Sequence, residues 1–403
     1  MLELSDVLEA RERVEAVARH TPLDYSHTFS DITGAKVHLK LETFQRTGSF
    51  KIRGASNRIA TLSPAEKEAG VVTASAGNHA QGVALAATRN GVDSKIVMPE
   101  YAPISKVKAT RAYGAEVVLH GADYDEAAEK AHEIEREEGR CYVHAFDDET
   151  VMAGQGTIGL EIYDDLPEVE TVVVGIGGGG LIAGIATALK AKNPDIRVIG
   201  VQAEGASSVA QSLEKGSVQE LDSVDTIADG IATRSVGQQT FEVIQERVDE
   251  VVTVSDSEIA VALISLLERG KTLVEGAGAV PLAALLSEKF DYEEGEVIVP
   301  ALCGGNIDLN VLTTVIMRGL VETGRYLKIR TVLKDRPGAL ERLIEVIAAE
   351  KANIYAIQHD RTSRDLAMNA AEVEIDLETR GHDHVAEVLA ALEQNDYEVD
   401  VLI

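Results

Sequence analysis

Cysteine, basic residues and uninterrupted apolar runs are all scarce in this chain of 403 residues. Its two cysteines, Cys141 and Cys303, are too few for a disulfide framework, and we expect reduced thiols in a cytoplasmic protein. The 38 basic residues are outnumbered by 67 acidic ones, which gives a net charge of -29. Because such a surface repels phosphate backbones and anionic lipids, nucleic acid and membranes are excluded as partners.

Two segments could be mistaken for targeting or membrane sequences. Residues 4–19 are charged and helix-like, and they lack the apolar core of a signal peptide. Residues 171–189 carry no charge and are long enough to raise the question of a membrane span. They contain six glycines, four of them consecutive, between a Val run and an Ala-rich stretch. A strand, a loop and a helix explain that pattern better.

The order of apolar segments predicts an α/β fold. With 45% hydrophobic and 26% charged residues, the chain has a globular composition and room for two or three domains. Short Val- and Ile-rich strands alternate with helices, which is typical of parallel sheets covered by helices on their faces. The predicted strands are 36–42, 71–74, 94–98, 116–119, 171–174, 198–201 and 296–302, and the predicted helices of the first half are 4–19, 55–61, 81–90, 104–113 and 124–138.

Residues 326–403 follow a different order of elements. They read strand, helix, strand, strand, helix, strand, at 327–333, 339–351, 354–361, 370–377, 384–394 and 397–402. This βαββαβ order is that of a small ferredoxin-like unit. We place the hinge before it at residues 322–325.

Lys51 stands between Phe50 and Ile52, directly after a Gly-Ser turn. An apolar setting disfavours the ammonium form of a lysine, so this amine could attack a carbonyl. Taken alone, the same residue reads as a surface lysine near the end of a strand. Only the motifs that follow give it a chemical role.

Residues 75–82 read Ser-Ala-Gly-Asn-His-Ala-Gln-Gly, after a predicted strand and at the start of a helix. Unpaired backbone N–H groups and the positive end of a helix make such a loop an anion site, suited to a substrate carboxylate. Asn78 could also donate a hydrogen bond to a phenolate oxygen of a cofactor. An ordinary helix cap, with Asn as the turn residue, explains the same residues without a ligand.

Residues 175–181 read Gly-Ile-Gly-Gly-Gly-Gly-Leu, after another predicted strand. Four consecutive glycines let the backbone wrap closely around a phosphate. The spacing of Gly175, Gly177 and Gly180 also fits the dinucleotide fingerprint, with Glu204 at the end of the next strand. A nicotinamide cofactor and a simple tight turn therefore both stay open at this motif.

Residues 301–306 read Ala-Leu-Cys-Gly-Gly-Asn and close the last predicted strand of this part. Cys303 would present a weak, uncharged S–H donor to a ring nitrogen, or pack as a small core residue. A lysine, a phosphate loop, an amide for an aromatic oxygen and a neutral group for a pyridine nitrogen are together the parts that pyridoxal 5′-phosphate needs.

With these motifs in order, the chain resembles the threonine ammonia-lyases (threonine dehydratases), fold-type II pyridoxal-phosphate enzymes of the tryptophan-synthase-β-like group. The resemblance covers residues 1 to about 320 and rests on the motifs Ser49–Gly54, Ser75–Gln81, Ala153–Ile158, Gly177–Gly180 and Cys303–Asp308. It implies two lobes of parallel sheet with helices on both faces. A small lobe of about 53–150 is expected within a large lobe made of 1–52 and 151–322. The tail 326–403 is similar to ACT domains through Leu333–Leu340 and Ala352–Ile354.

The resemblance also implies roles for single residues. Lys51 is the Schiff-base lysine, Phe50 lines the cofactor ring and Asn78 reaches its 3′ oxygen. Cys303 faces the pyridine nitrogen, where many relatives carry serine. The cofactor phosphate is held by Gly177, Gly178, Gly179, Gly180 and Leu181. The substrate carboxylate is bound by Ser75, Ala76, Gly77 and His79, and the loop Glu275–Gly278 lies near the cofactor.

The reaction implied is the conversion of L-threonine to 2-oxobutanoate and ammonia, with L-serine giving pyruvate. The similar serine racemases carry a second serine, an acid/base on the opposite face, where this chain has Ala76, so racemisation should be poor. They also bind a divalent cation through an acidic cluster. Here Glu204 is present but Ala210 takes the place of a second acid, and we predict no metal site.

The tail suggests regulation, because ACT domains pair with one another and bind amino acids at their interface. We expect a branched-chain amino acid, isoleucine or valine, as effector, and a homodimer or homotetramer. A dimerisation module without a ligand is the alternative. For the whole chain, an L-serine ammonia-lyase, a racemase-like enzyme and a non-catalytic amino-acid sensor are the other candidates.

Overall fold

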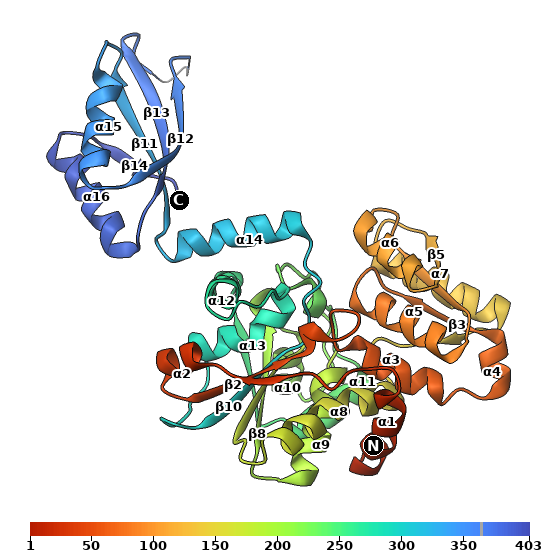
Figure 1. The fold of residues 1–403 in the computed structure, drawn as a ribbon. Coiled ribbons are helices and arrows are strands. Elements are labelled where there is room, and N and C mark those ends of the chain that lie inside the picture. The colour runs from red at the N-terminus through yellow and green to blue at the C-terminus, as the bar shows by residue number, and fades with distance from the viewer. Residues whose placement is uncertain (363–365) are drawn as a thin grey trace. The chain divides into compact units, whose positions relative to one another are not determined.

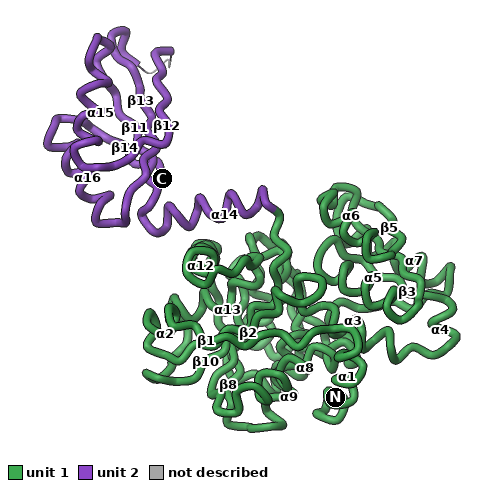
Figure 2. The backbone as a smooth tube through the Cα atoms, in the orientation of Figure 1, with its two compact units in different colours: residues 1–308 green, residues 309–403 purple. Residues whose placement is uncertain are grey.

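The computed structural model describes residues 1–362 and 366–403 (Figure 1). It divides into two compact units, residues 1–308 and 309–403 (Figure 2). We expected the division after residue 322, but helix α14 (Leu309–Glu322) groups with the second unit. The C-terminal end of α14 leads into β11 (Tyr326–Lys334), and the Glu322 carbonyl at that end lies 3.0 Å from Nε2 of His382 in the second unit, which explains the grouping. Within the described part of the chain, none of the helices has the length and apolar character of a membrane span.

A six-stranded sheet organises the large lobe of the first unit (Figure 1). The strand order is β1-β2-β10-β7-β8-β9, and every pairing is parallel except that of β1 with β2. The strands are β1 (Leu23–Tyr25), β2 (Lys36–Leu41), β7 (Thr171–Gly175), β8 (Arg197–Ala203), β9 (Glu250–Val254) and β10 (Val297–Leu302). The helices of this lobe are α1 (Leu4–Glu15), α2 (His27–Thr33), α8 (Glu149–Asp165), α9 (Gly180–Lys192), α10 (Ser208–Lys215), α11 (Gln238–Arg247), α12 (Asp256–Glu268) and α13 (Gly276–Leu286), with the short turns η1 (Glu42–Phe44), η2 (Glu204–Ala206) and η3 (Asp229–Ile231).

A second, four-stranded parallel sheet organises the small lobe, in the order β5-β4-β3-β6. Its strands are β3 (Val71–Ala74), β4 (Ser94–Met98), β5 (Glu116–Leu119) and β6 (Cys141–Tyr142), and its helices are α3 (Lys51–Ala60), α4 (Pro64–Ala69), α5 (Asn78–Asn90), α6 (Ile104–Ala112) and α7 (Tyr124–Glu138). Every residue of β3 is buried. Its side chains alternate between two apolar clusters, with Val71 in one and Val72 in the other, as expected of a parallel strand covered on both faces.

The predicted α/β fold is confirmed, and the differences lie at the element ends. Helix α3 begins at Lys51 rather than at residue 55, and α5 begins at Asn78 rather than at 81. The residues expected to carry chemistry therefore lie in first helical turns, where backbone N–H groups lack intrahelical partners. The sequence analysis missed β1, β6 and β9. Strands of two or three residues, such as β6 and β1, are too short to show a periodic pattern.

Glycine in the motif Ala153–Ile158 serves close helix packing in the large lobe. A Cβ on Gly184 of α9 would collide with the carbonyl of Met152, and one on Gly156 of α8 would lie 2.8 Å from the Gly184 carbonyl. A Cβ on Gly154 would lie 2.6 Å from Cα of Gly54 on α3. Glycine thus lets α8 contact both α9 and the helix that begins at Lys51.

The second unit has an antiparallel sheet in the order β12-β13-β11-β14. It contains β11, α15 (Ala339–Ala349), β12 (Asn353–Asp360), β13 (Ala370–Glu378), α16 (His382–Gln394) and β14 (Val399–Val401), after α14. Alternate residues of β11 and β13 are buried and form one core with both later helices. The predicted βαββαβ order is confirmed.

Candidate active site

Lys51 is the first residue of α3, and Phe50 precedes the helix. The Phe50 N–H donates to the Cys303 carbonyl over 3.1 Å, which ties this helix start to the end of β10. The Lys51 amine donates to the Ala145 carbonyl over 2.9 Å and lies 5.2 Å from the centre of the Phe50 ring. Burial lowers the pKa of Lys51 to about 8, against the opposing effect of the Glu275 carboxylate. Much of this amine is therefore in its nucleophilic form at mildly alkaline pH.

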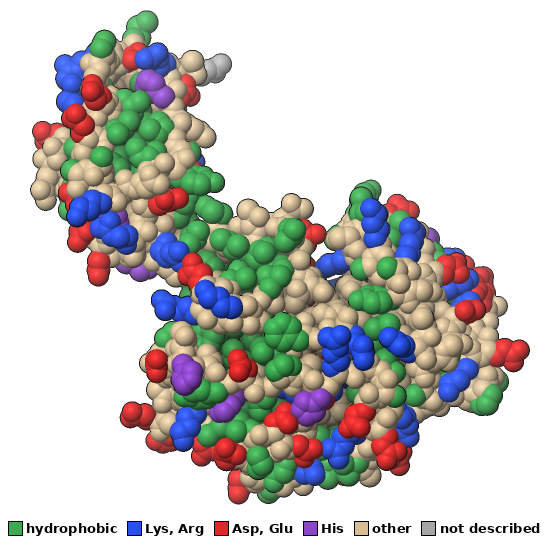
Figure 3. Space-filling view, viewed as in Figure 1, with side chains coloured by type: hydrophobic (Ala, Val, Ile, Leu, Met, Phe, Trp, Pro, Cys, Tyr) green, Lys and Arg blue, Asp and Glu red, His purple; other side chains and the backbone are tan. Residues whose placement is uncertain are grey.

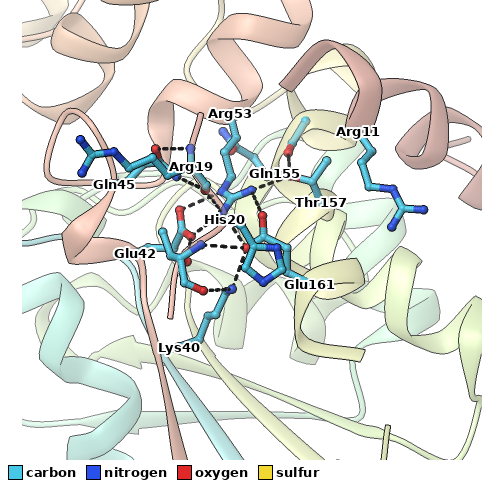
Figure 4. A network of polar contacts seen from close by, with 12 residues as sticks. Arg11, Arg19, His20, Lys40, Glu42, Gln45, Arg53, Gln155, Thr157 and Glu161 are labelled. Carbon is cyan, nitrogen blue, oxygen red and sulfur yellow. Dashed lines mark hydrogen bonds and ion pairs between the residues drawn. The ribbon is translucent and has the colours of Figure 1, made fainter. Parts of the chain in front are cut away.

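A cluster of enclosed charges supports the first turn of α3 (Figure 4). Arg53 lies between two carboxylates, with Glu42 at 2.7 Å and Glu161 at 2.6 Å, and Lys40 lies 2.6 Å from the second of these. The two carboxylates keep the pKa of Arg53 above its ordinary value despite its burial. Two cations and two anions balance here, and they fix α3 against β2 and α8 only two residues from Lys51. The sequence analysis missed this cluster, because it joins residues more than 100 positions apart.

The loop from Ser75 to His79 joins β3 to α5, as predicted. The Ser75 hydroxyl accepts the Gly77 N–H over 3.1 Å and so shapes the turn. Within the described part of the chain, the N–H groups of Ala76, Asn78 and His79 meet no protein acceptor. Ser75, Ala76 and Gly77 are partly exposed. The loop thus retains free donors at a helix N-terminus, which is the property an anion requires.

Asn78 is part of a polar network that the sequence analysis did not foresee. Its amide nitrogen donates to Glu275 over 2.7 Å, and its amide oxygen accepts from Asn306 over 2.8 Å. Burial raises the pKa of Glu275 above its ordinary value. A Cβ on Gly304 would collide with this carboxyl group, so the Cys303–Asp308 motif needs glycine there. The network therefore joins the Ser75–Gln81 motif, the Glu275–Gly278 loop and the Cys303–Asp308 motif.

His79 points away from the open side of its loop. Its side chain is 4% exposed, and Nε2 lies 3.0 Å from the Val143 carbonyl. Because a carbonyl only accepts, Nε2 carries the hydrogen and donates it. Burial, and then the charge of Lys51, lower the pKa of His79 to about 3. The ring is therefore neutral under ordinary conditions, and its backbone N–H is the group available to a substrate.

The glycine loop lies between β7 and α9, as predicted. Gly177 to Leu181 are buried, and within the described residues the N–H groups of Gly178, Gly179, Gly180 and Leu181 meet no protein acceptor. Gly179 has φ of 93°, a left-handed conformation that favours glycine. Buried N–H groups are almost always paired in proteins, so this row of free donors indicates a bound anion.

Cys303 packs among apolar side chains at the end of β10, in a cluster that also contacts Phe50. It is 6% exposed, and burial raises the pKa of its thiol well above the ordinary value. The thiol is therefore uncharged, which is the property expected of a group facing a pyridine nitrogen.

A connector that the sequence analysis missed brings these parts together. Residues 143–148 lead from β6 in the small lobe to α8 in the large lobe. Val143 accepts from His79, Ala145 accepts from Lys51, and the Phe146 ring lies on Gly178. Asp147 and Asp148 before α8 predict a helix cap. No local pattern in the sequence predicts that this connector contacts His79, Lys51 and Gly178.

These observations test whether pyridoxal 5′-phosphate fits the site. The row of free amide donors on the glycine loop suits its phosphate, and the Lys51 amine suits its aldehyde. The Ala145 carbonyl accepts the hydrogen bond of that amine, and the next residue, Phe146, packs against the glycine loop. The residues present therefore fit the cofactor. Among the described residues, no group of three or more His, Cys, Asp or Glu side chains is placed to hold a metal ion.

Comparison with known proteins agrees with this geometry. The model of a family described as pyridoxal-phosphate dependent enzyme matches residues 14–304, and that of the ACT domain matches residues 325–401. An L-threonine ammonia-lyase of Geobacter sulfurreducens is 52% identical over 403 residues, and one of Thermotoga maritima is 47% identical over 402 residues; both alignments cover 100% of each chain.

Two solved structures are similar to more than three quarters of this chain. The processed form of threonine deaminase isoform 2 from Solanum lycopersicum has a TM-score of 0.76 and 42% identity, covering 78% of this chain and 92% of its own. Maize serine racemase has a TM-score of 0.74 and 37% identity, covering 79% and 98%. The chain therefore belongs to the pyridoxal-phosphate dependent enzymes, in the group of threonine ammonia-lyases that carry a C-terminal ACT domain.

Proposed function

We propose that this protein is an L-threonine ammonia-lyase that forms 2-oxobutanoate and ammonia, and that it converts L-serine to pyruvate as a secondary reaction. The observation that carries the proposal is the Lys51 amine, whose pKa of about 8 lies well below the ordinary value, beside the buried free donors of the glycine loop. The relatives of the same length and domain order support threonine as the substrate.

Each part of the site has a task in this reaction. Pyridoxal 5′-phosphate, when bound, supplies the electron sink that makes the α-hydrogen of an amino acid acidic. The free N–H groups of the Ser75–His79 loop bind the substrate carboxylate and orient the α-carbon. Lys51 then removes the proton from that carbon and holds it on its Nζ atom. The neutral Cys303 thiol would face the pyridine nitrogen of the bound cofactor and, as an uncharged group, would leave that nitrogen without a charged partner.

Substitution of Lys51 tests the proposal directly. Lys51→Ala should abolish keto-acid formation from threonine and serine, and the visible absorbance of a lysine-bound cofactor. Lys130→Ala, at a half-buried position of α7 where the lysine pairs with Glu133, is the matched control and should keep both. Full activity of Lys51→Ala, or a wild-type protein that binds no cofactor and leaves both amino acids unchanged, would contradict the proposal. The second result would favour an amino-acid sensor.

The relative turnover of threonine and serine separates the proposed enzyme from an L-serine ammonia-lyase. Racemisation should be slow, because Ala76 offers no proton on the face opposite Lys51. Chiral chromatography of serine after incubation measures it. D-serine formed as fast as pyruvate would favour the racemase-like alternative. The similarity to maize serine racemase is the reason for testing this alternative.

We assign catalysis to the first unit and regulation to the second, with isoleucine or valine as effector and a homodimer or homotetramer as the assembly. The match to the ACT domain supports this assignment. Isoleucine should change the activity of the full chain, and a chain ending at Tyr326 should lose that response. Unchanged inhibition in the shortened chain would contradict the regulatory role, and sedimentation analysis gives the number of subunits.

A further inference from the structure

The connector between the lobes, residues 143–148, contacts the glycine loop as well as Lys51. A Cβ on Gly178 would collide with the Phe146 ring, and one on Gly180 would lie 2.7 Å from the Phe146 carbonyl oxygen. Glycine in this loop is therefore needed for the approach of Phe146 as well as for the row of free amides. The aromatic side chain covers the loop directly.

Asp147 holds the helix on the other side of the loop. Its carboxylate accepts the N–H groups of Gln239 at 2.9 Å, Thr240 at 3.1 Å and Gln238 at 3.2 Å, in the first turn of α11. A Cβ on Gly237 would collide with this carboxylate, so glycine admits it. A carboxylate at a helix N-terminus satisfies free donors and is stabilised by the helix dipole.

The first turn of α11 in turn holds the glycine loop. The Thr240 hydroxyl donates to the Gly178 carbonyl over 2.7 Å, and the Gly237 N–H donates to the same carbonyl over 3.3 Å. Asp147, the start of α11 and Gly178 thus form a continuous chain of hydrogen bonds. With its carbonyl held from this side, Gly178 keeps its peptide plane, and the neighbouring amides keep theirs.

His144 fixes the turn that presents both residues. Its Nδ1 accepts the N–H groups of Phe146 at 3.2 Å and Asp147 at 2.8 Å. Its ring meets the Phe146 ring edge-on, with 4.7 Å between centres. His144, Phe146 and Asp147 therefore form a clasp within the connector, and this clasp contacts the glycine loop and the start of α11.

We propose that Phe146 and Asp147 are positioning residues for the cofactor phosphate: they hold the glycine loop in the shape that aims its amides at one anion. This inference rests on the proposed function, since it needs pyridoxal 5′-phosphate as the ligand. It assigns to the connector a second task beside holding the Lys51 amine. Loss of the clasp weakens recognition of the phosphate and leaves the chemistry at the aldehyde unchanged.

The test compares two aldehydes that differ only in the phosphate. The cofactor is removed from the full-length protein, and imine formation by Lys51 is titrated with pyridoxal 5′-phosphate and with pyridoxal. The dissociation constant of pyridoxal divided by that of pyridoxal 5′-phosphate measures what the phosphate contributes to binding. Asp147→Ala and Phe146→Ala should each lower this ratio about tenfold, the size of effect expected when a helix cap or a local contact is lost. Asp147→Asn should restore most of it, because an amide oxygen still caps the helix.

Asp148→Ala is the matched control. Asp148 caps α8 through the N–H groups of Thr150 and Val151 and pairs with Arg58, without contact to the glycine loop. Its loss should lower the unfolding temperature and leave the ratio unchanged. Thr240→Val removes the hydroxyl contact to Gly178 without touching the connector, and should lower the ratio about threefold even if the Asp147 variant does not fold.

A wild-type ratio in Asp147→Ala or, where that variant does not fold, in Thr240→Val would overturn the inference. So would an equal fall of the ratio in Asp148→Ala, because the effect would then be one of general stability. Failure of the proposed function looks different: the wild-type protein itself would form no imine with either aldehyde.

Discussion

In the first unit, Lys40, Glu42 and Arg53 are almost completely enclosed by protein. The ion pairs described on the sheet of the second unit lie at its surface, where Figure 3 shows basic and acidic side chains. The pair of Arg330 and Asp400, for example, spans 3.3 Å with side chains that are 38% and 72% exposed. Enclosed charges must each have a partner, while an exposed pair contributes little to stability. A polar framework therefore holds the start of α3 in the catalytic unit, whereas apolar alternation along β11 and β13 builds the core of the C-terminal unit.

The two units also differ in what shifts the pKa values of their lysines. In the catalytic unit, burial displaces the pKa values of Lys51, His79, Glu275 and Cys303 from their ordinary values. In the C-terminal unit, the hydrogen bond to Glu374 raises the pKa of Lys328 and so favours its charged form, while burial raises the pKa of Tyr326 to about 12. Burial that disfavours charge is typical of sites where protons are transferred.

The largest effect should come from breaking the enclosed cluster. Arg53→Ala removes the cation that lies between Glu42 and Glu161 and leaves Lys40 beside Glu161. Removal of one partner from such a cluster costs about 3–5 kcal/mol. Urea unfolding of the cofactor-loaded protein, followed through the cofactor absorbance, measures the loss for the catalytic unit. A loss below about 1 kcal/mol would mean that this cluster behaves like an exposed pair.

The next largest effect should be a loss of stability of the catalytic unit in acid. The pKa of His79 is about 3 in the folded protein and 6.5 ordinarily, so between these values the unfolded chain binds more protons than the folded one. Its contribution to stability is complete above about pH 6.5 and is lost as the pH falls toward about 3. The unfolding temperature of the catalytic unit should fall over this range, and His79→Asn should reduce the fall. An equal fall in that variant would assign the effect to other groups.

A smaller effect should appear in the titration of Lys51. In the cofactor-free protein, its reaction with pyridoxal should rise with pH and reach half of its maximum near pH 8. Glu275→Gln should move this midpoint to lower pH, because the Glu275 carboxylate favours the ammonium form. The exposed Glu133→Gln should leave the midpoint in place. A shift to higher pH in Glu275→Gln would contradict the assigned geometry.

The smallest effect is expected in the second unit. Arg330→Ala should cost no more than about 1 kcal/mol, because its partner Asp400 is exposed and the Arg330 and Glu372 side chains keep part of their surface in water. Chemical unfolding followed through the tyrosines of this unit, Tyr326, Tyr355 and Tyr397, measures it. A cost as large as that of Arg53→Ala would mean that this exposed pair contributes as much to stability as the enclosed cluster of the first unit.

Much of the fold was predictable from local patterns. The bounds of β3, β4, β5 and α7 match the predicted ranges because their apolar periods are clear. The starts of α3 and α5 were predicted late, because their first turns contain Gly, Lys, Asn and His in place of an apolar stripe. For the site, the motifs around Lys51, Ser75 and Gly177 could be predicted, since each combines a turn with one kind of chemistry.

The sequence by itself determined the element order, the glycine-rich turns and the lysine between two apolar residues, because these depend on neighbours along the chain. Only the tertiary structure decided that Ala145 holds the Lys51 amine, 94 positions away, and that Asn78 meets Glu275, 197 positions away. It also decided which groups carry charge, because the pKa of a side chain depends on the burial and the charges around it. Burial comes from the packing of distant segments, and no local pattern records it.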